Sequence, residues 1–257
     1  ECLKYFKIDY PIEITTFADI PANTGLGSSS AFAVGLVNAL FALEGKLASK
    51  YEIASIAAKI EIDILGRKIG KQDHFACCYG NINNLVFKKN ETVVINPIVA
   101  SSRSIKTLEA NMIMFYTNQK RNSETVLKNQ YRIKKKQIEN LKKLKDLVGI
   151  SKDIILNKNF RAKEFGILLN RNWELKKKIN RLSSNKLVDK YYNQALNLGA
   201  YGGKLLGAGN GGFLLFIASK SSQKKIANKL NKLKKMYIKF DYSGTRITYF
   251  DKSGEAN

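Results

Sequence analysis

The 257-residue sequence predicts an α+β protein built from two domains. Helical and strand-like segments follow one another without the strict β-α-β alternation that a parallel sheet requires. The length suits one or two domains, each with its own core. The stretch from Ser101 to Leu108 is polar and lacks strong periodicity. We therefore expect an N-terminal domain over residues 1–104 and a C-terminal domain over residues 105–257.

The expected N-terminal domain begins with a strand-like stretch from Tyr10 to Ala18. An apolar, Ala-rich run from Ser28 to Leu43 predicts a buried helix. Ser49 and Glu52 form a capping box, which starts a second helix that Gly66 stops. The remaining expected elements are a short helix at 73–79 and strands at 84–88 and 92–95.

The expected C-terminal domain begins with a strand, continues with several amphipathic helices and then reaches a glycine-rich stretch. In chain order we expect a strand at 112–117, helices at 123–147, 162–179 and 187–198, a glycine-rich loop at 202–212, a strand at 213–217, a helix at 222–235 and a strand or hairpin at 236–250.

Composition excludes several classes of protein. Three cysteines cannot make a disulfide framework, and no apolar run approaches a membrane span, so we expect a cytoplasmic protein that does not enter a membrane. The net charge of +23 is high enough for a nucleic-acid binder. Much of the excess is lysine spread through amphipathic helices, such as the one from Ser123 to Leu147, where lysines separate apolar residues that include Val126, Leu127, Tyr131 and Ile138. A solvated helix face explains this pattern, a positive field would also attract a phosphorylated substrate, and a non-catalytic nucleic-acid-binding protein stays an alternative.

The string Pro21-Ala22-Asn23-Thr24-Gly25-Leu26-Gly27-Ser28-Ser29-Ser30-Ala31 leads through a glycine-rich turn into a helix. Glycines let backbone N–H groups wrap a phosphate, and the positive end of the helix dipole favours the same anion. The serine hydroxyls suit phosphate or Mg²⁺. The string is neither a Walker A loop nor a dinucleotide fingerprint. A serine N-cap after an ordinary turn is the plainer reading.

A second glycine-rich string runs from Gly203 to Phe213, with Asn210 at one position in it. Asn adopts the left-handed conformation more readily than other residues that carry a Cβ, so it can replace glycine in such a bend. Taken alone, the string also fits a bend before a core strand.

Two carboxylates lie between these strings. Glu61 falls at the edge of the apolar face of its helix, where a charge needs a partner such as Mg²⁺ or a surface lysine. Asp73 opens the next helix, where a carboxylate is also a common N-cap.

Together the two glycine-rich strings resemble the phosphate-binding motif and the C-terminal glycine motif of the GHMP kinases. The resemblance implies that the two motifs pack together in a ribosomal S5 domain 2-like N-terminal part and a ferredoxin-like C-terminal domain. It implies ATP and Mg²⁺ as cofactors, Asp73 as the catalytic aspartate, and Ser29 and Glu61 as Mg²⁺ ligands. The residues that it assigns to nucleotide binding are Pro21, Ala22, Asn23, Gly25, Leu26, Gly27, Ser28, Ser29, Ser30, Gly207, Ala208 and Gly209.

Within that superfamily the sequence is most similar to the D-glycero-D-manno-heptose 7-phosphate kinases. The similarity rests on the stretches 60–66, 70–73, 114–117, 168–177 and 202–209 and covers nearly the whole chain. It implies phosphorylation of the anomeric hydroxyl of a heptose 7-phosphate. Fucokinase-like or galactokinase-like activity is the alternative.

An N-terminal motif with Arg and Gly-Gly residues, usual in GHMP kinases, is not recognisable before Pro11. The resemblance therefore implies a chain that lacks the N-terminal part of the enzyme and several sugar and adenine contacts with it. Among the remaining candidates, we expect His74 to pack against or orient a neighbour, and Cys77, Cys78 and Trp173 to fill the core. Lys71 and Arg67 are expected at a solvated rim, and contact with a substrate phosphate is the alternative.

Overall fold

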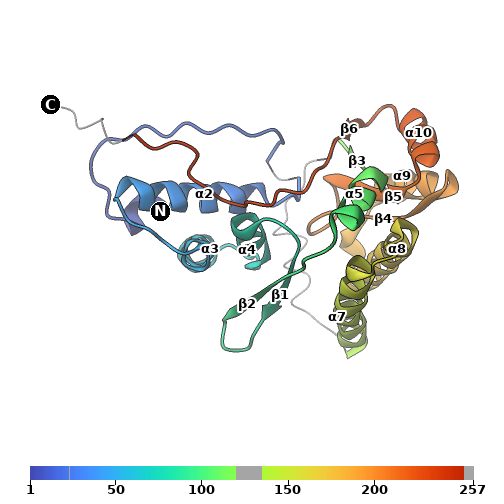
Figure 1. Ribbon diagram of the computed structural model, residues 1–257, viewed down its shortest axis with the longest axis horizontal. Coiled ribbons are helices and arrows are strands. Elements are labelled where there is room, and N and C mark those ends of the chain that lie inside the picture. The colour runs from blue at the N-terminus through green and yellow to red at the C-terminus, as the bar shows by residue number, and fades with distance from the viewer. Residues whose placement is uncertain (23, 120–134, 252–257) are drawn as a thin grey trace. The chain divides into compact units, whose positions relative to one another are not determined.

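The computed structural model describes residues 1–22, 24–119 and 135–251, which form two compact units (Figure 1). Unit 1 contains Glu1–Pro21, Gly27–Asn81 and the C-terminal segment that starts at Asp241. Unit 2 contains Ala22–Leu26 and Ile82–Phe240. The sequence of elements is α+β, as predicted.

Unit 1 is helical. Its elements are α1 (Cys2–Tyr5), α2 (Ser28–Leu43), α3 (Lys50–Lys59), the π-helical turn η1 (Ile60–Ile64) and α4 (Gln72–Tyr79). The apolar run 28–43 forms α2 with the expected limits, and Ser49 Oγ accepts a hydrogen bond from the Glu52 N–H at 3.1 Å, as the capping box predicts. Val37, Ala57 and Phe75 pack from α2, α3 and α4 into the core of this unit.

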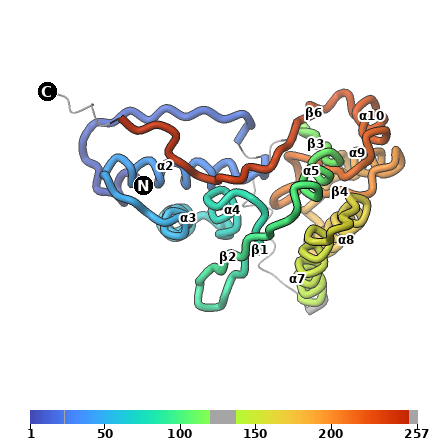
Figure 2. Tube along the Cα trace, viewed as in Figure 1, coloured from blue at the N-terminus to red at the C-terminus, as the bar shows by residue number. Residues whose placement is uncertain are grey.

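Two segments expected to form strands, one near each end of the chain, do not form them. Residues 10–18 have no regular secondary structure, and after β6 (Lys234–Met236) the described chain continues irregularly to residue 251. A strand needs a ladder of hydrogen bonds to a neighbouring strand, and among the described residues neither segment belongs to a sheet. The C-terminal segment instead lies along α2 and α4 (Figure 2), where Asn38 Nδ2 donates to Thr245 Oγ1 at 3.2 Å and the Thr245 N–H donates to the carbonyl of Cys78.

Unit 2 starts with an antiparallel hairpin, β1 (Asn83–Phe87) and β2 (Val93–Pro97), close to the expected strands. A second, four-stranded antiparallel sheet has the order β4-β5-β3-β6, built from β4 (Ala200–Leu205), β5 (Phe213–Ala218), β3 (Met112–Tyr116) and β6. Counted along the chain, its strands lie in the order second, third, first, fourth. This is the ferredoxin-like arrangement that the family resemblance implies.

The helical elements of unit 2 are α5 (Ser102–Asn111), α7 (Lys135–Leu156), α8 (Ala162–Ile179), the 3₁₀ turn η3 (Arg181–Ser183), α9 (Lys186–Asn197) and α10 (Lys220–Lys229). Helices α5, α8, α9 and α10 pack against the sheet, whereas α7 packs on α8. Trp173 of α8 is fully buried beside Tyr192 of α9 and Phe216 of β5, so its expected core position is confirmed. Of the lysine-rich helix, Val126, Leu127, Tyr131 and Lys134 lie outside the described residues.

The polar stretch chosen as a boundary is helical. Ser101 Oγ accepts from the Ser104 N–H at 3.0 Å and starts α5, whose Leu108 is buried with Ala162 and Ile217 of unit 2. The compact units consequently divide after residue 81 rather than between residues 104 and 105. The two domains named from the sequence, 1–104 and 105–257, stay a prediction about the family's domains. None of the helices in the described part of the chain combines the length and hydropathy that crossing a bilayer needs.

Two local expectations also change. Gly202 and Gly203 belong to β4, because they pair with Ile217 and Phe216 of β5, so the glycine loop is shorter than 202–212. Helix α10 ends at Lys229, and β6 occupies part of the range given to it. Cys78 is buried and Cys77 half-buried, and burial raises the pKa of both thiols to about 11, as suits core residues.

Candidate active site

In unit 1 the end of the predicted phosphate loop becomes the start of α2. Gly27 precedes the helix with a φ of +69°, a conformation that glycine adopts without strain. A Cβ at this position would lie 3.2 Å from Cβ of Asp73. The glycine therefore allows the first turn of α4, which carries Asp73, to approach the loop closely. The first N–H groups of α2 have no partner inside their own helix, which is the property of an anion-binding terminus.

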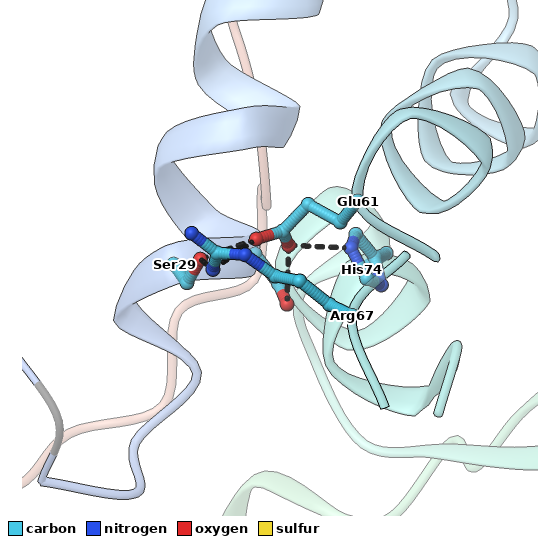
Figure 3. Close-up of polar contacts among 5 residues, drawn as sticks. Ser29, Glu61, Arg67 and His74 are labelled. Atoms are coloured by element: carbon cyan, nitrogen blue, oxygen red, sulfur yellow. Dashed lines mark hydrogen bonds and ion pairs between the residues drawn. The ribbon is translucent and has the colours of Figure 1, made fainter. Parts of the chain in front are cut away.

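Glu61 lies across from that terminus, in the π-helical turn η1 that extends α3. The wider turn leaves Ile60 and Glu61 both buried, and only 4% of Glu61 is exposed. Its carboxylate is hydrogen-bonded to the side chains of Ser29 and Ser30 from α2 and of His74 from α4 (Figure 3). Ser29 Oγ donates to Oε1, Ser30 Oγ donates to Oε2 at 3.4 Å, and His74 Nε2 lies 2.8 Å from Oε2. Since a carboxylate only accepts, this nitrogen carries the proton. His74 thus orients Glu61, in line with its expected role.

The carboxylate of Glu61 is held in its charged form. Burial alone would raise the pKa of Glu61, but hydrogen bonds from His74 and Ser29, together with the charges of His74 and Arg67, outweigh it and lower this pKa. A buried, ionised carboxylate beside a serine hydroxyl presents two oxygen ligands of the type that Mg²⁺ prefers.

Arg67 has partners that the sequence did not predict. Its side chain is exposed to solvent as expected, but its Nη1 also donates to Glu61 Oε1 at 2.8 Å and to Ser29 Oγ at 2.7 Å (Figure 3). The alternative of Glu61 as a rim carboxylate paired with lysine is wrong, because Glu61 is buried, forms an ion pair with Arg67 and is hydrogen-bonded to His74. The turn at Gly66, with a φ of +65°, was a usable signal, since it folds residue 67 back over residue 61.

In unit 2 the second glycine string forms a loop between β4 and β5. Asn210 has a φ of +64°, so its left-handed conformation is as predicted. At Gly212 the φ is +100°, and a Cβ there would overlap the carbonyl oxygen of Thr24. The carbonyl of Gly212 accepts from both the N–H and the Oγ1 of Thr117, each at 2.8 Å. The glycine loop thus packs directly on the first half of the predicted phosphate loop.

Further contacts fix this loop. The Asn210 N–H donates to the carbonyl of Ser183, Asn185 Nδ2 donates to Asn210 Oδ1 at 3.2 Å, and Lys176 Nζ donates to the carbonyl of Gly207. Sequence reasoning missed Ser183, Asn185 and the buried Thr24. Only Thr24 carried a signal, its position inside the string.

The two units therefore hold different parts of the predicted site. Unit 1 brings together Gly27, Ser29, Ser30, Glu61 and Asp73, and it also contains Pro21 and Ser28. Unit 2 contains Ala22, Gly25, Leu26, Gly207, Ala208 and Gly209. Asn23 lies outside the described residues. The predicted phosphate loop crosses the division between the units.

Comparison with known proteins decides the family. The GHMP kinases N terminal domain matches residues 1–81, and the GHMP kinases C terminal domain matches residues 155–235. A D-glycero-alpha-D-manno-heptose 7-phosphate kinase of Campylobacter jejuni is 33% identical over 247 residues, covering 94% of this chain and 71% of the relative. The chain is a GHMP kinase.

Other relatives of this kinase act on several substrates. A crystal structure of a D-glycero-D-manno-heptose 1-phosphate kinase from Bacteriodes thetaiotaomicron matches with a TM-score of 0.74 and 26% identity, over 94% of this kinase and 69% of that chain. A galactokinase of Pyrococcus furiosus is 26% identical and covers 87% of this kinase and 68% of the relative. This GHMP kinase is accordingly an ATP-dependent phosphotransferase of the sugar-kinase type.

Proposed function

We propose that the kinase transfers the γ-phosphoryl group of ATP to the anomeric hydroxyl of D-glycero-D-manno-heptose 7-phosphate. The observation that carries the proposal is the unit 1 cluster, in which Ser29, Glu61 and Asp73 converge on the N-terminus of α2. The choice of sugar rests on the likeness to the heptose 7-phosphate kinase, which is stronger than the likeness to the galactokinase.

Phosphoryl transfer depends on positioning and on neutralisation of charge more than on covalent catalysis. In this proposal, the loop from Gly25 to Ser30 and the first N–H groups of α2 bind the ATP phosphates. Residues 207–209 of the second glycine loop are further proposed nucleotide-binding residues. The +23 charge of the chain favours two anionic substrates.

Ser29 and Glu61 are the proposed ligands of Mg²⁺. Their two oxygens lie so close that a single nitrogen of Arg67 bonds to both, so a cation at the position of that nitrogen would reach both oxygens. The oxygen types match the preference of Mg²⁺, which takes its other ligands from water and phosphate. When bound, Mg²⁺ would neutralise charge on the transferred phosphoryl group.

Asp73 is the proposed general base. Its carboxylate lies beside Gly27 of the phosphate loop, where the side chain can accept a proton from the attacking hydroxyl. His74, the next residue in sequence, is hydrogen-bonded to Glu61 and orients that carboxylate instead.

ADP release tests this proposal, with Mg²⁺-ATP and the protein expressed from its natural reading frame. Heptose 7-phosphate, galactose and fucose are compared as acceptors. Asp73→Asn should reduce turnover by at least about a hundredfold, because it removes the base. The control is Asp63→Asn, which neutralises an exposed carboxylate of the same unit and should leave turnover unchanged.

Turnover limited to heptose 7-phosphate supports the sugar assignment. Turnover with galactose or fucose alone would contradict it and would favour the alternative anomeric kinases. Full activity of Asp73→Asn would contradict the role given to Asp73.

A further inference from the structure

The guanidinium of Arg67 lies on the same two oxygens that the proposed function assigns to Mg²⁺. One nitrogen, Nη1, is 2.7 Å from Ser29 Oγ and 2.8 Å from Glu61 Oε1 (Figure 3). Hydrogen bonds between a guanidinium and a carboxylate are among the strong ones in proteins. The positively charged guanidinium therefore occupies the proposed metal site.

The fold of unit 1 sets this position through the backbone as well as the side chain. The helix ends in η1, Gly66 turns the chain in a left-handed conformation, and the Arg67 N–H donates to the carbonyl of Glu61 at 3.0 Å. Residue 67 is therefore anchored to residue 61 twice. A long, unanchored side chain that merely reaches the carboxylate would lack the backbone bond.

The electrostatics explain why a cation is needed there. The side chain of Glu61 is only 5% exposed, and an unpaired buried carboxylate is costly. His74 and Ser30 occupy Oε2, whereas Oε1 faces Ser29 and Arg67. Arg67 thus supplies the positive charge at Oε1 and keeps the two oxygens together.

The same contacts oppose a divalent cation. Mg²⁺ would lie about 2.0–2.1 Å from the oxygens that ligate it. The nitrogen of Arg67 occupies that region, and two positive charges so close repel each other strongly in a buried site. Because the side chain of Arg67 is 43% exposed, it can move outward into solvent, or onto an anionic phosphate, without crossing the core.

We infer that Arg67 is a positioning residue that holds the Ser29–Glu61 pair in the nucleotide-free kinase and must be displaced before a divalent cation can bind. The inference rests on the metal role given to Ser29 and Glu61 in the proposed function. Its consequence is an order of binding. The free kinase binds the divalent ion weakly, and the metal enters together with a nucleotide whose phosphates provide both extra metal ligands and a new partner for the guanidinium.

The test is a Mn²⁺ titration of the nucleotide-free protein, with free Mn²⁺ followed by electron paramagnetic resonance. Arg67→Met removes the charge and the hydrogen bonds and should tighten Mn²⁺ binding by at least about tenfold. Lys68→Met is the matched control, because Lys68 is the next residue in the chain and is exposed to solvent. It removes the same charge at nearly the same place and should change Mn²⁺ affinity by less than about twofold. Arg67→Gln, which keeps a donor to Glu61 without the charge, should show the same gain as Arg67→Met and serves if that variant fails to fold.

Equal Mn²⁺ affinity in the wild type and the Arg67 variants would overturn the inference, and so would an equal gain in Lys68→Met. Adding Glu61→Gln to Arg67→Met separates this outcome from a failure of the proposed function. Loss of the gain in the double variant supports Ser29 and Glu61 as the site. A gain that persists without the Glu61 carboxylate would overturn the metal role itself, and the inference with it.

Discussion

The site residues of unit 1 and of unit 2 are built on different principles. In unit 1, side chains meet: Glu61, Arg67, His74 and two serines form a charged network on a buried carboxylate. In unit 2 the main chain makes the contact: the Gly207–Gly212 loop has several residues with positive φ angles, and the backbone of Gly212 packs against the backbone of Thr24. The first region should therefore be sensitive to a loss of charge, and the second to the addition of a single carbon atom.

Gly212→Ala is the change expected to have the largest effect. The added Cβ overlaps the carbonyl of Thr24 in a backbone conformation that alanine rarely adopts, so the free energy of unfolding should fall by about 3–5 kcal/mol. Thermal or urea unfolding measures it. Gly149→Ala is the control, since it lies in α7 with no atom near the new Cβ, and it should stabilise the helix by about 0.5–1 kcal/mol. Equal stability of Gly212→Ala and the wild type would contradict the backbone packing of unit 2.

Glu61→Gln tests the other region. It keeps the shape of the side chain and removes the charge that Arg67 and the proposed metal share, so turnover should fall by about a hundredfold, while the free energy of unfolding falls by only about 1–3 kcal/mol. Kinetics with unfolding curves on the same preparations measure both. Asp63→Asn, an exposed carboxylate of the same helical turn, should change neither. A Glu61→Gln variant with normal turnover would show that the charged network is structural only.

Helix caps provide the smallest expected effect, and one cap is available in each unit. Ser49 caps α3, which leads to Glu61, and Ser219 caps α10. Replacing either serine by alanine should lower the free energy of unfolding by about 1 kcal/mol. Because neither cap contacts the site side chains, turnover should stay within about twofold of the wild type. A large loss of turnover in Ser49→Ala alone would mean that the Glu61 network depends on the start of its helix.

The fold was largely predictable where local signals act alone. The limits of α2 and α8, the cap at Ser49 and the left-handed Asn210 follow from periodicity, capping chemistry and the preferences of single residues. The prediction of a strand at 10–18 was wrong, because a strand forms only beside a partner strand, and a short stretch of sequence does not specify that partner. The helix α5 was not predicted for a related reason. Its buried residue Leu108 packs against Ala162 and Ile217, which lie far along the chain.

The candidate site was predictable in its residue types and less so in its contacts. The glycine strings and the two carboxylates stood out in the sequence, and the family resemblance gave them roles. The partners were harder to foresee. Arg67 reaches Glu61 because of a π-helical turn and a left-handed glycine, and Thr24 meets Gly212 from 188 residues away. Such pairings depend on tertiary structure rather than on local pattern.

The most direct test of the account is the position of the new phosphate in the product. Heptose 7-phosphate is incubated with Mg²⁺-ATP and the kinase, and the product is analysed by ³¹P NMR with coupling to the sugar protons. The account predicts a second phosphate signal coupled to the anomeric proton, present with the wild type and Asp63→Asn and absent with Asp73→Asn. A phosphate on another carbon, or the same product from Asp73→Asn, would contradict it.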